Sequence, residues 1–228
     1  MNVSKSNEMP ISKPWYKKWW GILIILTIII VLCFISLFLY GVKLAAESQS
    51  LASKQEMIKK IQGDDDNYWL GSSNPKVTIV EFADFACSVC KQASPNIKKI
   101  MQKYQNDVKI IFRDLPVNAD YSVRLASAAR CAGDQKLFWE MHDKLFLNQG
   151  ISSDEELINL ATQLGIGNEK FKNCLKNNKH IPKIEKDFND GAELGLSGTP
   201  TWFVNGQKIE GNIPYENMAT IIDKIISE

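Results

Sequence analysis

An uninterrupted apolar run near the N-terminus limits the topology of this chain more than any other feature. Residues 21–40, GILIILTIIIVLCFISLFLY, carry no charged side chain. As an α-helix this run would be about 30 Å long, which matches the hydrocarbon thickness of a bilayer. Secretory signal peptides use shorter apolar segments and a small-x-small cleavage site, which the following GVKLAAES does not offer cleanly. We therefore favour an uncleaved membrane anchor over a cleaved signal peptide.

The residues that flank this run predict its orientation in a cytoplasmic (inner) membrane. Five aromatic side chains would lie at the two interfaces, namely Trp15, Tyr16, Trp19, Trp20 and Tyr40. Four lysines precede the run (Lys5, Lys13, Lys17 and Lys18), and Lys43 follows it. Because positive charge is retained on the cytoplasmic side, we expect residues 1–20 in the cytoplasm and the remainder outside it. Cys33, within the run, is interpreted as a small apolar residue in lipid.

Residues 41–63 predict a solvated helical spacer, or stalk, between the anchor and a domain at 64–228. Leu44, Leu51 and Ile58 recur at seven-residue spacing and give a thin apolar stripe on an otherwise polar helix. A weak self-association seam is the alternative, but these positions are too few for a coiled coil. The net charge of +1 gives no basic surface, so we expect no nucleic-acid partner.

The patterns within 64–228 predict a mixed α/β domain. The segments KVTIVEF (76–82) and VKIIF (108–112) are apolar and β-branched, as buried strands are. Helices are predicted from Cys87 to about Tyr104, through most of 120–195, and at 215–226. GSSNP (71–75) is interpreted as a turn, and TWFVNGQKIEG (201–211) as a hairpin that turns at Asn-Gly. Gly133 and Asp134 are interpreted as a helix stop and a helix cap.

Two of the five cysteines, Cys87 and Cys90, lie where the first strand is predicted to give way to a helix. At a helix N-terminus the macrodipole favours a thiolate, and a second cysteine one turn later can close a disulfide with it. We expect Cys87 to be the exposed nucleophile and Cys90 the resolving cysteine. A structural zinc site needs a second close ligand pair, whereas Cys131, Cys174, His142 and His180 are scattered along the chain. We therefore expect no metal, and the absence of nucleotide-binding motifs predicts no cofactor.

Three further residues have two interpretations each. Glu81 is either a solvent-facing strand residue or a buried carboxylate with a raised pKa that exchanges a proton with Cys90. Its spacing from Cys87 does not distinguish the two. Cys131 and Cys174 form either a disulfide, which an oxidising compartment favours, or two buried free thiols. Four cysteines allow three pairings, so the sequence does not establish this one.

The segment VTIVEFADFACSVC resembles the active-site segment of the thioredoxin superfamily, and most of all that of its DsbA-like branch. Glu81 takes the position of that family's buried acid, and Pro95 that of the proline in the active-site helix. SGTPTWFVNG resembles the cis-proline loop, with Thr199 preceding Pro200, and VNGQKIEGNIPYENM resembles the closing hairpin and helix. The resemblance implies a thioredoxin fold over 64–228, with a helical insertion at about 115–192 between the active-site half and the cis-proline half.

The resemblance also implies an activity, that of a membrane-anchored thiol–disulfide oxidoreductase. Thr199 and Pro200 would lie beside Cys87 and bind a client segment as an added strand. The clients would be exported or secreted proteins with cysteines, which receive a disulfide through a mixed disulfide on Cys87. A quinone-linked membrane partner, DsbB-like or VKOR-like, would reoxidise the pair.

The two residues between the cysteines depart from the family's most oxidising pattern. Ser88 and Val89 stand where those members typically carry Pro-His, and Val89 cannot stabilise a Cys87 thiolate as a histidine does. Reduction potentials in such proteins run from about −270 to −120 mV, so the direction of electron flow stays open. A disulfide donor is the leading prediction. The alternatives are a reductase or isomerase kept reduced by a membrane electron donor, and a membrane-tethered binding module without catalysis.

Overall fold

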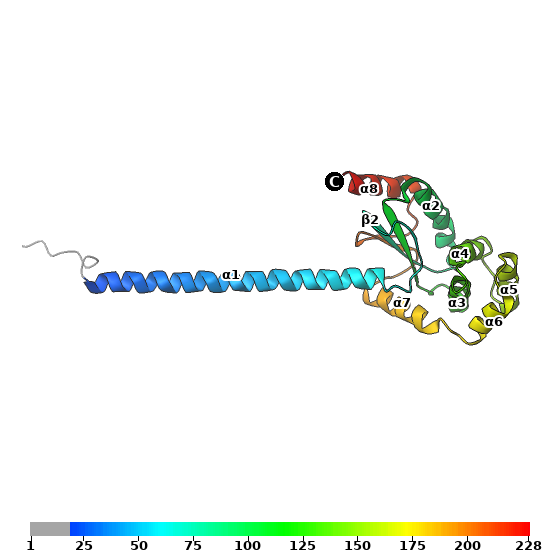
Figure 1. Cartoon of the computed structure of the whole chain (residues 1–228), viewed down its shortest axis with the longest axis horizontal. Helices are drawn as coiled ribbons and strands as arrows, with labels where there is room; N and C mark the ends of the chain where they lie inside the picture. Colours follow the sequence, from blue (N-terminus) through cyan, green and yellow to red (C-terminus); the bar gives the residue numbers. More distant parts are fainter. Residues whose placement is uncertain (1–18) are drawn as a thin grey trace, which may run out of the picture. The chain divides into compact units, whose positions relative to one another are not determined.

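The computed structural model describes residues 19–228 and consists of two units that divide between Gln55 and Glu56 (Figure 1). The first unit contains most of helix α1 (Trp19–Gln62), and the large apolar side chains of α1 within this unit are exposed. Within the described part of the chain, α1 is the one helix long and apolar enough to cross a membrane. The leading lysines, and the expected interface residues Trp15 and Tyr16, lie outside the described residues.

The second unit is built on a five-stranded sheet of order β1-β3-β2-β4-β5. The strands are β1 (Trp69–Gly71), β2 (Val77–Ala83), β3 (Val108–Asp114), β4 (Thr201–Val204) and β5 (Gln207–Glu210). The central strands β2 and β3 pair in parallel, whereas β1, β4 and β5 run antiparallel to their neighbours. Nearly every residue of β2 is buried, because this apolar, β-branched segment is covered on both faces.

Helices cover both faces of this sheet (Figure 1). Helices α2 (Ser88–Tyr104) and α8 (Tyr215–Ser227) pack on one face, and α7 (Ile181–Glu193) lies on the other. The remaining helices are α3 (Ser122–Gly133), α4 (Phe138–Leu147), α5 (Asp154–Gln163) and α6 (Asn168–Lys176). All of α3–α7 follow β3 and precede β4. This is the predicted thioredoxin-like α/β fold with a helical insertion.

The predicted hairpin forms between β4 and β5, and helices form in the regions that were predicted to be helical. Asn205 and Gly206 turn β4 into β5 with φ values of 47° and 85°, a left-handed conformation that Asn-Gly adopts readily. Two local predictions were wrong. Strand β1 was missed, because a three-residue edge strand carries too short a pattern to recognise. Asp134 does not begin the next helix, since the backbone N–H of Asp134 closes α3 on Arg130 and α4 begins only at Phe138.

A buried ion-pair network ties the helical insertion to the sheet. Arg113 of β3 contacts Asp187 of α7 at 2.9 Å, and Arg130 of α3 contacts both Asp187 at 2.7 Å and Asp114 at 2.5 Å. Both guanidinium groups are buried, so each needs acceptors on every side. The network therefore sets the position of α3 and α7 against β3.

The end of α1 belongs to the same network, which corrects the picture of a wholly solvated spacer. The Arg113 Nη1 donates to the carbonyl oxygens of Lys60 at 2.8 Å and Ile61 at 3.0 Å. The Ile61 side chain is only 2% exposed and packs with Phe82 and Phe203. The last turn of the predicted spacer is therefore part of the compact unit, because Arg113 needs the two carbonyl groups and the core needs the isoleucine.

Candidate active site

Cys87 lies at the junction between β2 and α2, where it caps the helix. Its backbone is extended (φ −76°, ψ 121°), and its Sγ accepts a hydrogen bond from the backbone N–H of Cys90 at 3.3 Å. Cys87 is only 5% exposed, so the prediction of an exposed nucleophile was wrong, because the loop that carries Thr199 contacts its sulfur. Cys90 is fully buried, and both are free thiols in this structure. The helix N-terminus therefore directs an N–H group and its positive dipole end at the sulfur of Cys87.

The two thiols have very different acidities. A hydrogen bond from the Cys90 side chain is the largest effect that lowers the pKa of Cys87, which falls to about 5 despite burial. The Thr199 side chain and the backbone N–H groups of Val89 and Cys90 lower it further. Burial raises the pKa of Cys90 far above its ordinary value, and hydrogen bonding to Cys87 adds to the rise. At neutral pH the reduced pair therefore holds a thiolate on Cys87 and a proton on Cys90.

The loop before β4 brings Thr199 to the same sulfur. The Thr199–Pro200 bond is cis, and Sγ of Cys87 lies 3.3 Å from the Thr199 carbonyl oxygen, to which it donates when it is protonated. Pro200 is buried, whereas Thr199 is partly exposed. The structure thus brings the predicted Thr199–Pro200 segment to Cys87, which lies 112 positions before Thr199 in the sequence.

Glu81 lies within β2, between β3 and β4, and is completely buried. Neither carboxylate oxygen has a hydrogen-bond partner among the described residues. Burial raises the pKa of Glu81 to about 8, and the charge on Cys87 adds to this effect. The charge on Glu81 in turn raises the pKa of Cys90. Of the two interpretations of Glu81, the solvent-facing one was wrong, and its role in proton exchange stays a prediction.

The residues between the cysteines occupy the first turn of α2. Ser88 is exposed and Val89 is partly exposed. Their side chains carry no charge, so the low pKa of Cys87 arises from hydrogen bonds rather than from a neighbouring cation. Whether Ser88 and Val89 tune the potential stays a prediction.

Two polar residues that the sequence did not single out connect these loops. The Asn118 side-chain amide donates to Asp84 Oδ2 and to Thr199 Oγ1, each at 2.9 Å. Asp84, at the end of β2, also accepts from the backbone N–H groups of Ala86 at 2.8 Å and Val117 at 2.9 Å. Asn118 therefore orients the Thr199 hydroxyl that faces Cys87. The sequence held no signal for this contact, since Asn118 follows β3 and lies far from both partners along the chain.

Gln149, just after α4, supports the loop that leads from β2 to Cys87. Its side-chain amide donates to the carbonyl oxygens of Phe85 at 2.9 Å and Cys87 at 2.7 Å. The helical insertion thus contacts the active-site loop directly through hydrogen bonds to its backbone.

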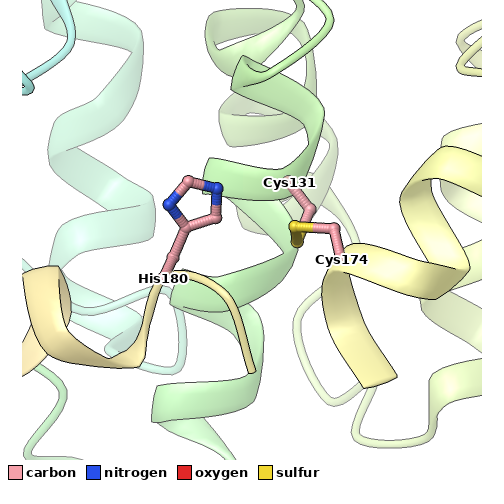
Figure 2. A group of neighbouring side chains, drawn as sticks. All are labelled: Cys131, Cys174 and His180. Carbon is pink, nitrogen blue, oxygen red and sulfur yellow. A yellow bond between two sulfur atoms is a disulfide. The ribbon is translucent and has the colours of Figure 1, made fainter. Parts of the chain in front are cut away.

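Two of the three remaining cysteines form a disulfide away from this site in the sequence, whereas Cys33 of α1 is a free thiol. Cys131 of α3 is bonded to Cys174 of α6, with Cα atoms 5.8 Å apart. Of the two interpretations, the disulfide is confirmed. Within the described part of the chain, side chains that could hold a metal gather here, where His180 joins the two cysteines (Figure 2).

Comparisons with known proteins agree with this geometry. Residues 64–224 match the family model described as thioredoxin. An Na⁺/H⁺ antiporter, NhaA 1 of Salinispora arenicola, is 36% identical over 155 residues, which make up 67% of this chain and 24% of the antiporter. NhaA of Herminiimonas arsenicoxydans is 28% identical over 153 residues, again 67% of this chain and 24% of the antiporter. The matched segment therefore spans about a quarter of the length of these relatives.

Solved structures resemble the chain over most of their length. The thiol-disulfide exchange protein α-DsbA2 of Wolbachia pipientis superimposes with a TM-score of 0.69 at 23% identity, covering 79% of this chain and 98% of that one. Oxidised BdbD of Bacillus subtilis superimposes with a TM-score of 0.66 at 26% identity, covering 73% and 96%. The fold is thus that of DsbA-like thiol-disulfide oxidoreductases.

Proposed function

The chain belongs to the thioredoxin family, and from that premise we propose that it is a protein-disulfide oxidase, which donates disulfides to exported proteins on the outer side of the cytoplasmic membrane. Helix α1 would be its single anchor, with the N-terminus inside the cell. The redox pair would be Cys87 and Cys90.

The proposed reaction moves two electrons from a client dithiol to the pair. A client thiolate attacks Sγ of Cys87 in the Cys87–Cys90 disulfide, which forms a mixed disulfide and releases Cys90 as a thiolate. Cys90 takes up a proton, for which the protonated carboxyl of Glu81 is the buried source. The second client thiolate then attacks the client sulfur of the mixed disulfide, and Cys87 leaves as a thiolate. The client gains a disulfide and the pair becomes a dithiol.

The hydrogen bonds from the side chain and the backbone N–H of Cys90 to Sγ of Cys87, which lower the pKa of Cys87 to about 5, are the observation that carries this direction of flow. A thiolate with a low pKa is a good leaving group, so the last step of donation is fast. At pH 7 a pKa of about 5 favours the reduced form about 100-fold over a thiol that stays protonated, which corresponds to about 60 mV in potential. The pKa lies between the values of about 7 and 3.5 typical of thioredoxin and DsbA.

Thr199 and Pro200 would receive the client beside this sulfur. The loop before β4 presents partly exposed backbone at Thr199, next to Cys87. An extended client segment can pair with such backbone as an added strand, which aligns its cysteine with Sγ of Cys87. A quinone-linked membrane protein would then reoxidise the pair.

A reductase or isomerase is the second candidate, and one observation favours it. Neither Ser88 nor Val89 places a cation beside Cys87, so the thiolate is stabilised by fewer interactions than a histidine would permit. Such an enzyme would be kept reduced by a membrane electron donor and would rearrange or reduce client disulfides.

The reduction potential of Cys87–Cys90 in glutathione buffers tests the proposal. A value clearly above the roughly −270 mV of thioredoxin, together with loss of oxidative refolding of a reduced client in Cys87→Ala, supports the oxidase. A potential at or below that of thioredoxin, with the pair mostly reduced in cells, would support the reductase or isomerase instead.

A further inference from the structure

The disulfide between Cys131 and Cys174 lies against groups that are typical ligands of a metal ion. His180, immediately before α7, faces the disulfide that joins α3 to α6 (Figure 2). The ligand atoms of Cys131, Cys174 and His180 all lie within 4.8 Å of one another. A fourth group completes the cluster, since Asp134 Oδ2 is 3.1 Å from His180 Nε2 and 3.6 Å from Cys174 Sγ.

Two of these separations, those of Asp134 from His180 and Cys174, are close to the edges of a tetrahedral zinc site. Zinc binds thiolate sulfur at about 2.3 Å and imidazole nitrogen or carboxylate oxygen at about 2.0–2.2 Å. In a tetrahedron these bond lengths place the ligand atoms about 3.3–3.8 Å apart. The contacts of Asp134 with His180 and Cys174 already lie in or near that range, at 3.1 and 3.6 Å. The two sulfur atoms need to separate from a covalent bond to about 3.8 Å, a change that rotation of the two side chains can supply.

We propose that opening of the Cys131–Cys174 disulfide creates a binding site for one Zn²⁺, with ligands from Cys131, Cys174, His180 and Asp134. The opening consumes one dithiol reductant, which is oxidised to a disulfide by two successive exchanges while both cysteines become thiols. Zinc then binds the two thiolates, and their two protons leave to solvent. This inference is independent of the redox role of Cys87.

The surroundings of the Cys131–Cys174 disulfide allow a metal ion to enter and balance the charge of the proposed site. A surface cavity of about 450 Å³ opens over the disulfide and is lined by both cysteines and Asp134. The cation Lys179 contacts Asp134 Oδ2 at 2.8 Å, so the carboxylate already pairs with positive charge. The Lys179 side chain is 56% exposed and can move outward when zinc arrives. The net charge is then zero for the cluster of two thiolates, one carboxylate, Zn²⁺ and the nearby Lys179 ammonium group.

The site would couple zinc concentration to the state of this disulfide. Because zinc binds the dithiol and not the disulfide, it shifts the equilibrium toward the dithiol by a factor of 1 + [Zn²⁺]/Kd. At a free zinc concentration 100 times Kd, the dithiol is favoured about 100-fold, which raises the reduction potential by about 60 mV.

The test uses the full chain in detergent micelles with the other cysteines removed by Cys33→Ala, Cys87→Ser and Cys90→Ser. The protein is reduced with a phosphine, freed of reductant without oxygen, and titrated with Co²⁺, whose visible spectrum reports tetrahedral thiolate coordination. We expect one Co²⁺ per chain after reduction, none before it, and displacement by Zn²⁺. His180→Ala and Asp134→Asn should each weaken binding at least tenfold. Lys170→Ala, which alters the same cavity at a residue outside the proposed ligand set, should not.

Three outcomes would overturn the inference. One is a reduced chain that binds no Co²⁺. Another is Co²⁺ binding that is equally strong with His180 and Asp134 intact, with His180→Ala and with Asp134→Asn. A dithiol in an unfolded chain would bind Co²⁺ in this way. The third is a Cys131–Cys174 reduction equilibrium that zinc does not shift. Near-UV circular dichroism of each reduced variant verifies folding, and His180→Gln replaces His180→Ala if the latter does not fold.

Discussion

Replacing the buried carboxyl with an amide in Glu81→Gln should stabilise the protein at neutral pH and leave its stability unchanged in acid. Glu81 is fully buried with a pKa of about 8, whereas the ordinary value is 4.5. Between these two pH values the unfolded chain loses the proton and the folded chain keeps it. Stability therefore falls as pH rises through this window, at about 1.4 kcal/mol per pH unit. From pH 4.5 to pH 7 the loss is about 3 kcal/mol.

Glutamine resembles protonated glutamate in shape and polarity but does not titrate. We expect Glu81→Gln and the wild type to have nearly equal free energies of unfolding at pH 4. At pH 7 the variant should be more stable by about 3 kcal/mol. The thiolate of Cys87 also makes stability depend on pH, with the opposite sign, because its folded pKa is lowered. Both proteins are therefore measured as dithiols, so that the contribution of Cys87 cancels in the difference except for its smaller interaction with the charge of Glu81.

The assay is urea unfolding of a fragment that spans residues 56–228, the compact unit of the structure. The difference between variant and wild type is determined at pH 4, 5, 6 and 7. A difference that stays constant across this range would refute the raised pKa of Glu81, since it would mean that this carboxyl group ionises in the folded protein at its ordinary pKa. A variant that is less stable than the wild type at pH 7 would refute it as well.

Three further outcomes follow from the structure. Asn118→Ala should raise the pKa of Cys87 by about one unit, because the Thr199 hydroxyl loses the donor that orients it. Thiolate absorbance as a function of pH measures this pKa, and an unchanged value would contradict the contact from Asn118. A fragment of residues 64–228 should be about 2–4 kcal/mol less stable than one of residues 56–228, because it lacks the buried Ile61 side chain and the acceptor carbonyl groups of Lys60 and Ile61. Equal urea midpoints and slopes for the two fragments would show that these contacts contribute nothing to stability. Replacing Cys131 and Cys174 with alanine should lower the free energy of unfolding by about 4 kcal/mol, because their disulfide spans 43 positions and restricts the unfolded chain. Thermal unfolding that shows no loss of stability in this variant would contradict that expectation.

Much of the fold could be predicted because its signals are local. The apolar β2 segment, the amphipathic α8 and the Asn-Gly hairpin each lie within a few consecutive residues, and their periodicity reports the surroundings directly. The three-residue β1 and the true start of α4 could not be predicted. Both depend on pairing or packing with distant segments, and neither leaves a pattern of its own.

The candidate site divides in the same way. Cys87 and Cys90 are recognisable because a helix N-terminus acts on residues adjacent in sequence. The burial of Glu81 was undecided until β3 and β4 were seen to pair on either side of it. The contact from Asn118 to Thr199 joins two loops that have no common pattern, and only their packing reveals it.

The apolar helix, the order of the elements and the pairing of Cys87 with Cys90 follow from the sequence alone, because each rests on short-range periodicity, spacing or helix electrostatics. The contacts between distant groups depend on tertiary packing. Packing brings Cys131 and Cys174 within bonding distance and places His180 beside their disulfide, although no sequence pattern indicates that the three residues meet. Ligation and buried ionisation require distances of a few ångströms, and the packing of whole helices establishes those distances.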